Sequence, residues 1–165
     1  MVERHSHTTE FRDQTASLSL ELDAFGAPKW NLPHSPETQG YLPYQEALET
    51  IRKHYALDPE NPTTPLAQDL RLALLARLNP SQTGNLAVHF YSAIGTQLDH
   101  HHGIDAFLDI VKDGHLVKTI TLDATLNPQK QTTGHKADVI VGDLSALRSE
   151  EWWRMIDRIL TQMSL

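Results

Sequence analysis

The fold is decided by residues 87–142, which read AVHFYSAIGTQLDHHHGIDAFLDIVKDGHLVKTITLDATLNPQKQTTGHKADVIVG. This stretch holds most of the strand-like sequence of the chain and its densest group of side chains able to bind a metal ion. Two of its acids, Asp105 and Asp123, lie within runs of β-prone residues, where a carboxylate is normally disfavoured. We therefore predict that these two carboxylates share one cation.

Four strands are expected in and beside this stretch, because β-prone residues alternate or run together there. They span residues 86–94, 103–111, 116–126 and 137–141. The dipeptide Asp113-Gly114 between the second and third strands is a strong signal for a tight turn. We expect these two strands to form an antiparallel hairpin.

Helices are predicted on both sides of the strands. Residues 44–57 carry apolar side chains at steps of three and four, which is the helical period. Residues 66–78 repeat that pattern after Thr64, a predicted N-cap, and Pro65, which suits the first helical position. A last helix is expected over residues 150–163.

The N-terminal part of the chain has a weaker pattern. Residues 1–16 are polar without clear periodicity, residues 18–22 alternate as a peripheral strand would, and residues 24–43 are rich in glycine and proline. We therefore treat residues 1–43 as an irregular extension. The order of elements that follows predicts one α+β domain over residues 1–165, with a mixed, largely antiparallel sheet flanked by helices.

Composition limits the classes of function. An apolar fraction of 39% and a charged fraction of 21% fit a soluble globular protein. No apolar run approaches the roughly 20 residues needed to cross a bilayer, the first residues lack the centre of a signal peptide, and there is no cysteine. We expect a cytoplasmic protein without membrane contact. The net charge of −7 opposes binding to nucleic acid, which usually requires a basic surface.

Strand alternation places the two acids on comparable faces of the hairpin. Asp123 shares its face with Thr121, and Asp105 shares its face with Phe107 and Asp109. Two carboxylates at close range repel each other, and a hard divalent cation such as Mg²⁺ removes that cost. Each acid alone is equally consistent with a solvated or backbone-bonded carboxylate, but the pair favours a metal. Asp109 is interpreted as a surface charge.

Residues 103–107 (GIDAF), a β-turn, and residues 119–125 (TITLDAT) resemble the core of the PD-(D/E)xK nuclease superfamily. The resemblance covers residues 66–141 and implies a restriction-endonuclease-like fold, in which helices flank a mixed sheet. It also implies that Asp105 and Asp123 are the two acids that bind Mg²⁺ or Mn²⁺. The main-chain carbonyl of Ala124 would be a further ligand.

The resemblance implies additional site residues outside the hairpin. An acid on the preceding helix, either Asp69 or Glu46, would be an extra metal ligand. The superfamily's lysine, two positions after the second acid, is replaced here by Thr125. Lys130 or Lys136 in the following loop would then orient the attacking water, or the protein would bind metal without cleaving its substrate.

A run of three histidines, residues 100–102, supports a different kind of site. Residues two apart on an extended chain face the same way, so His100 and His102 could join Asp99 or Asp105 in a zinc or iron site. His102 is the best single candidate for a ligand or a substrate contact. A solvated loop is the more common structure for such a run.

Three functions follow from these patterns. The first is a metal-dependent nuclease or nuclease-like phosphodiesterase that lacks the usual motif lysine. The second is a non-catalytic module on the same fold that binds a protein partner. In that case, because the adjacent Trp152 and Trp153 cannot both face inward, one of them marks a contact with a partner or a second copy of the chain. The third is a histidine-rich protein that binds a transition metal.

Overall fold

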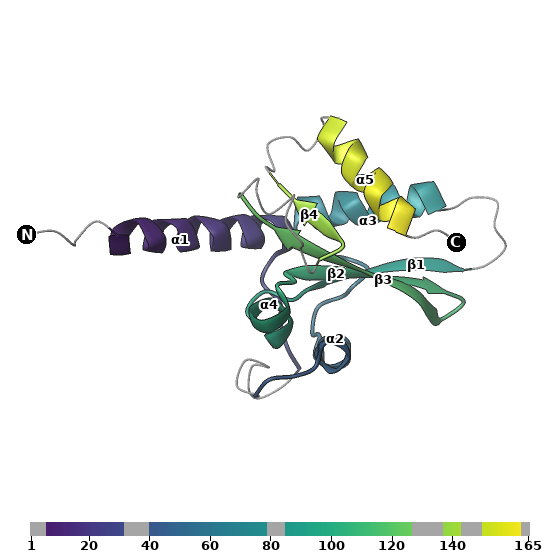
Figure 1. Ribbon diagram of the computed structural model, residues 1–165. Helices are drawn as coiled ribbons and strands as arrows, with labels where there is room; N and C mark the ends of the chain where they lie inside the picture. Colours follow the sequence, from purple (N-terminus) through teal and green to yellow (C-terminus); the bar gives the residue numbers. More distant parts are fainter. Residues whose placement is uncertain (1–5, 32–39, 79–84, 127–136, 143–149, 163–165) are drawn as a thin grey trace, which may run out of the picture.

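The computed structural model describes residues 6–31, 40–78, 85–126, 137–142 and 150–162, and a four-stranded sheet lies at its centre (Figure 1). The strands are β1 (Leu86–Ser92), β2 (Ala106–Lys112), β3 (His115–Ala124) and β4 (Val139–Val141). They lie side by side in this order; β1, β2 and β3 pair antiparallel, and β4 pairs parallel to β3. The predicted α+β class with a mixed, largely antiparallel sheet is confirmed.

The hairpin between β2 and β3 turns at the predicted Asp113-Gly114. Both residues have positive φ, 50° and 79°, as a two-residue turn matched to the twist of the strands requires. The Asn85 N–H donates to Oδ1 of Asp113 at 2.9 Å, and the Asp113 N–H donates to the Asn85 carbonyl at 2.9 Å. These bonds also join the turn to the start of β1, so the register of three strands is fixed at one end.

Helices cover both faces of the sheet (Figure 1). One core contains buried residues of α1 (Ser6–Phe25), α3 (Pro65–Leu78) and α5 (Glu150–Gln162), together with one face of the sheet. A second core lies on the other face beneath α2 (Tyr44–His54) and α4 (Gln97–His102). Strand alternation separates the cores, since Leu108 and Ile120 belong to the first and Phe107 to the second. No described helix combines the length and apolarity that a bilayer crossing requires.

The prediction for the N-terminal part of the chain was wrong for residues 6–25, whereas residues 26–31 and 40–43 lie outside helices and named strands, as predicted. Residues 6–25, expected as an irregular lead and a short strand, form the helix α1. The alternation of leucines at 18–22 is not a strand pattern, because Leu20 packs on the core whereas Leu18 and Leu22 are exposed. In the helix the spacing that matters is four: Leu20 lies one turn before the buried Ala24, and Glu21 one turn before the buried Phe25. Residues 1–5 and 32–39 of the predicted extension lie outside the described residues.

Gly26 ends α1 and connects it to α3. Its φ is +76°, and its N–H donates to the Leu22 carbonyl at 2.9 Å. A Cβ atom at this position would lie 2.6 Å from Oγ1 of Thr63, so the close approach of the two segments requires glycine. Thr64 is the predicted cap of α3: its Oγ1 accepts the Ala67 N–H at 3.3 Å and donates to the Ala24 carbonyl at 2.7 Å. The end of one helix is therefore bonded to the start of the other.

The remaining predicted helices and strands are confirmed, with ends that differ by a few residues. The helix predicted over residues 44–57 ends at His54, and the strand predicted from residue 103 begins at Ala106. The short helix α4, which lies before β2, was not predicted.

The two tryptophans of α5 differ as expected, since Trp152 is 9% exposed and Trp153 is 49% exposed beside the guanidinium of Arg77. We predict that Trp152→Ala lowers the free energy of unfolding by about 3–5 kcal/mol, because it leaves a cavity in the first core. Trp153→Ala should cost at most about 1 kcal/mol, the value of an exposed cation–π contact. Urea denaturation of both variants measures the difference, and equal losses would contradict this packing of α5.

Candidate metal site at the start of the hairpin

The structure brings Asp105 and Asp123 together. Asp105 immediately precedes β2; its N–H donates to the Leu122 carbonyl at 2.9 Å, and its Oδ2 accepts the Ala124 N–H at 2.8 Å. This bonding continues the hairpin register, so Asp105 stands across from Asp123, and the two side chains are hydrogen-bonded. Both carboxyl groups are almost fully buried, with exposed fractions of 3% and 4%.

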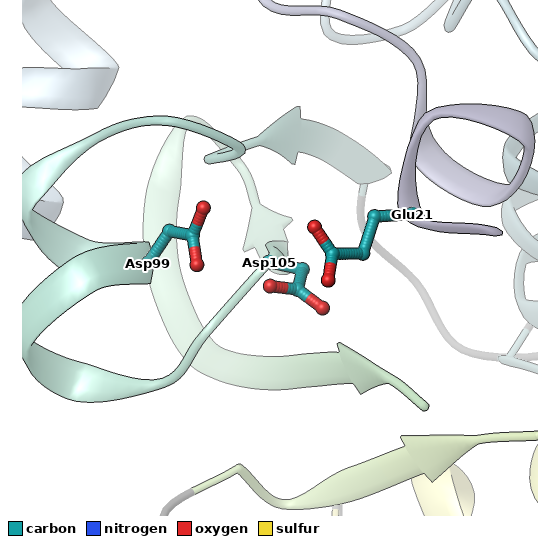
Figure 2. Close-up of side chains that lie close together, drawn as sticks. All are labelled: Glu21, Asp99 and Asp105. Atoms are coloured by element: carbon teal, nitrogen blue, oxygen red, sulfur yellow. The ribbon is translucent and has the colours of Figure 1, made fainter. Parts of the chain in front are cut away.

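Two more carboxylates reach this point from helices. Glu21 of α1 and Asp99 of α4 lie with Asp105 so that one ligand oxygen of each is within 4.8 Å of the others, and the three side chains point toward one another (Figure 2). Oxygens on opposite sides of a bound cation are about 4.2 Å apart for Mg²⁺ and up to about 5 Å apart for Ca²⁺. The spacing therefore suits a single hard cation.

Each of these three carboxylates has a hydrogen-bond donor that fixes its orientation. The hydroxyl of Ser17, one turn earlier in α1, donates to Oε1 of Glu21 at 3.0 Å. The Gly95 N–H, in the loop before α4, donates to Oδ2 of Asp99 at 2.8 Å. With the Ala124 N–H on Asp105, the three acids from separate segments are held in place before any ligand arrives.

The electrostatics of the cluster favour a cation. Burial raises the pKa of Asp105 from 3.8 to about 9, and the hydrogen bond with Asp123 and the negative charges of Glu21 and Asp123 act in the same direction. The Ala124 N–H acts in the opposite direction and only partly offsets them. None of the charged groups that shift this pKa is positive. At neutral pH the Asp105 carboxyl therefore keeps its proton.

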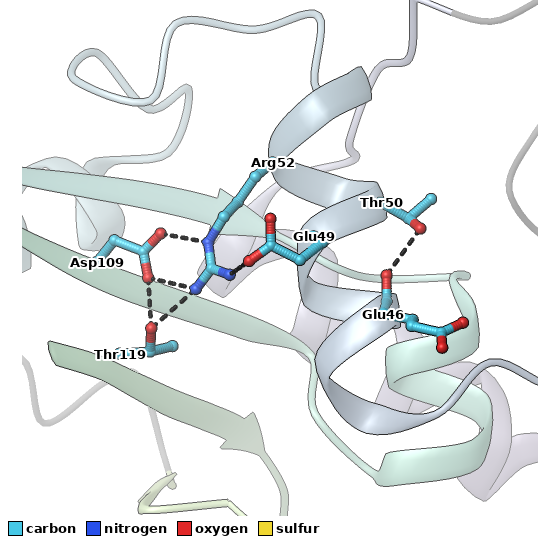
Figure 3. Close-up of polar contacts among 6 residues, drawn as sticks. All are labelled: Glu46, Glu49, Thr50, Arg52, Asp109 and Thr119. Carbon is cyan, nitrogen blue, oxygen red and sulfur yellow. Dashed lines mark hydrogen bonds and ion pairs between the residues drawn. The ribbon is translucent and has the colours of Figure 1, made fainter. Parts of the chain in front are cut away.

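The same face of the sheet holds a second acid that is neutralised differently (Figure 3). Asp109 was interpreted as a surface charge, but it is 3% exposed, so that interpretation is wrong. The Nε and one terminal nitrogen of Arg52 in α2 donate to its two oxygens at 2.7 and 2.9 Å, and the Thr119 hydroxyl donates to Oδ1 at 2.7 Å. These hydrogen bonds also raise the pKa of Arg52. Asp109 thus has a protein cation, whereas the carboxylates around Asp105 face one another.

The other predicted site residues either lie away from this cluster or fall outside the residues that the structure describes. Among the residues that the structure describes, the acids and histidines close enough to hold one ion are Glu21, Asp99 and Asp105. Asp69 on α3 and Glu46 on α2 are exposed and do not belong to this group. Ala124 is adjacent through its N–H, and its predicted role as a carbonyl ligand stays a prediction. The predicted lysines, Lys130 and Lys136, lie outside the described residues.

The histidine run is helical, not extended, which removes the geometric argument for a zinc or iron site. Residues two apart on a helix are about 200° apart around its axis, so His100 and His102 do not face the same way. His102 instead places its Nε2 2.9 Å from the Leu42 carbonyl, and its ring lies against Tyr41 and Tyr44.

Sequence reasoning missed Glu21 and gave Asp99 different partners. The signal for Glu21 was the inward stripe of α1, in which Leu20, Glu21 and Ala24 recur at steps of three and four. The signal for α4 was the glycine at 103 after a polar run, because glycine commonly follows the last residue of a helix; in the structure its φ is 65°.

Comparison with known proteins gives no relative: no family model, curated protein or solved structure matches this chain. The candidate site therefore depends on its own geometry and charge.

Proposed function

We propose that this protein is a metal-dependent phosphodiesterase of the nuclease type. In this proposal Glu21, Asp99 and Asp105 hold Mg²⁺ or Mn²⁺, and Asp123 lies beside them. The observation that carries the proposal is the meeting of two buried carboxyl groups, Asp105 and Asp123, with the half-buried Glu21 and Asp99, and no positively charged group among those that shift the pKa of Asp105. Buried charges are normally paired or coordinate a metal, and this set contains oxygen ligands alone, which is the preference of a hard cation.

The arrangement of elements supports a restriction-endonuclease-like core as part of this proposal. The first acid precedes β2, the second lies in β3, and β4 runs parallel beside β3. Glu21, from the helix α1, takes the place that was expected for an acid on a preceding helix. Helices on both faces hold this sheet, which leaves the acid cluster at the edge where α1, α4 and the hairpin meet (Figures 1 and 2).

The proposed chemistry is hydrolysis of a phosphodiester. A bound Mg²⁺ or Mn²⁺ would supply a nucleophilic water at neutral pH and would neutralise charge on the phosphate. Asp105 and Glu21 hold the ligand oxygens in a water-poor site, and Asp123, next to Asp105 on the hairpin, is placed to accept a proton from the water. Lys130 or Lys136 takes the role of the missing motif lysine.

Thr125 favours a second candidate, a non-catalytic module that keeps the metal. It occupies the position of the superfamily's lysine, is 6% exposed, and donates its N–H to the Val141 carbonyl at 2.9 Å. A protein that binds metal here without hydrolysis would use an exposed surface such as Trp153 for a protein partner or a second copy.

We expect Mg²⁺ or Mn²⁺ at 100 times its dissociation constant to stabilise the protein by about 2.7 kcal/mol, which is roughly 5–10 °C in melting temperature. Asp105→Asn should abolish this shift, because it removes one of the three proposed ligands. It should not unfold the metal-free protein, since burial already keeps the Asp105 carboxyl uncharged at neutral pH, with its pKa at about 9. Differential scanning calorimetry measures the shift, and cleavage of labelled oligonucleotides with Mg²⁺ tests the activity.

Asp113→Asn is the matched control, since it removes an exposed acid at the far end of the same hairpin. It should keep the full metal shift. An equal shift in the wild type and in Asp105→Asn would exclude this site. A normal shift without cleavage of single- or double-stranded oligonucleotides would leave the second candidate in place of the first.

A further inference from the structure

Four aromatic rings gather at the surface where α4 meets the segment before α2. Ring centroids are 5.6 Å apart for Tyr41 and His101, 5.8 Å for Tyr41 and His102, and 5.8 Å for Tyr44 and His102. We call these four residues the ring cluster. The contact of its Nε2 with the Leu42 carbonyl fixes the position of the His102 ring within this group.

The ring cluster adjoins the carboxylates. Asp99 and His102 are three residues apart on α4, so they are neighbours on its surface, with Cβ atoms about 5–6 Å apart. Asp105 follows His102 by three residues, after the turn at Gly103. The rings and the carboxylates are therefore close together along one short segment of the chain, residues 99–105.

The ring cluster differs from the aromatic residues of the second core, because Tyr41 is exposed to solvent. Tyr91 and Phe107 in the second core are stacked with centroids 4.8 Å apart and are buried. Tyr41, by contrast, is 66% exposed, although it is in contact with two histidine rings. An exposed aromatic surface of this kind is suited to stack on a flat ligand.

We propose that the ring cluster stacks on the unpaired bases of a single-stranded nucleic acid whose phosphate lies at the carboxylates. This inference rests on the proposed function and names its substrate class. Bases in a duplex stack on one another and hide their faces, whereas bases in a single strand are free to stack on tyrosine and histidine.

The test measures binding separately from cleavage. Fluorescence anisotropy would follow labelled single-stranded DNA and RNA of one sequence, with Ca²⁺ as the cation and the intactness of each strand checked on a gel. Tyr41→Ala should weaken binding about tenfold, the effect of losing one stacked base, whereas Tyr41→Phe should bind as the wild type does. The two strands distinguish whether the bases come from DNA, RNA or both.

Trp153→Ala is the matched control, because Trp153 is an exposed aromatic residue on α5, on the opposite face of the sheet (Figure 1). It should leave binding unchanged. The inference is overturned if Tyr41→Ala binds both strands as tightly as the wild type, if Trp153→Ala weakens binding equally, or if the wild type binds neither strand. The proposed function fails separately if binding depends on Tyr41 but the wild type shows no Mg²⁺ shift and no cleavage.

Discussion

Replacing Arg52 with methionine should lower the free energy of unfolding by about 3–5 kcal/mol, because it leaves the carboxylate of Asp109 buried without its cation. Asp109 is 3% exposed and receives two hydrogen bonds from Arg52 (Figure 3). The Thr119 hydroxyl would remain as a donor, but one neutral hydrogen bond does not replace a paired guanidinium. Urea denaturation at neutral pH measures the loss.

The double variant Arg52→Met/Asp109→Asn separates the effect of the unpaired charge from the effect of lost side-chain packing. Asparagine removes the buried charge, so the double variant should regain much of the stability that Arg52→Met loses. Glu49→Gln is the control, because Glu49 also accepts a hydrogen bond from Arg52, at 2.9 Å, but is exposed. It should change stability by less than about 1 kcal/mol. A double variant less stable than Arg52→Met would contradict the interpretation that the uncompensated charge is the cause.

The hairpin could be predicted from the sequence because its signals are local. The Asp113-Gly114 turn predicts the pairing next to it, but the register shifts by one residue between Ile110 and Val111, and this shift places Asp105 across from Asp123. The helix α1 could not be predicted in the same way. Its Leu18, Leu20 and Leu22 mimic a strand, and the packing that selects the helix comes from α3 and β3, which are distant in sequence.

For the same reason the sequence predicted only part of the candidate site: Asp105 with Asp123, but not Glu21. A carboxylate in a strand is unusual, but the sequence does not say what neutralises it. Asp109 is paired with an arginine 57 residues away, whereas Asp105 meets Glu21 and Asp99, which approach from two helices that were not predicted. Only the tertiary fold distinguishes an acid that is paired with a protein cation from one whose neighbours are other carboxylates.

The affinity for Mg²⁺ should rise about tenfold for each pH unit from about pH 6 up to about pH 9 and then level off. Burial raises the pKa of Asp105 to about 9, and the hydrogen bond with Asp123 and the negative neighbours add to this effect. Metal binding requires the carboxylate, so below pH 9 each bound ion must displace one proton. Isothermal titration calorimetry in two buffers of different ionisation enthalpy should show release of about one proton at pH 7.

The metal-free protein provides an independent test of the same pKa. In the unfolded chain Asp105 loses its proton near its ordinary pKa of 3.8, whereas in the folded protein it keeps the proton up to about pH 9. The folded state therefore binds one more proton between these values. The stabilisation is fully present below about pH 3.8 and is lost as the pH rises through about 9. Asp105→Asn should remove this dependence in urea denaturation, because asparagine does not titrate. If the stabilities of the wild type and Asp105→Asn change with pH in the same way, the Asp105 carboxyl does not hold the proton that metal binding is predicted to release.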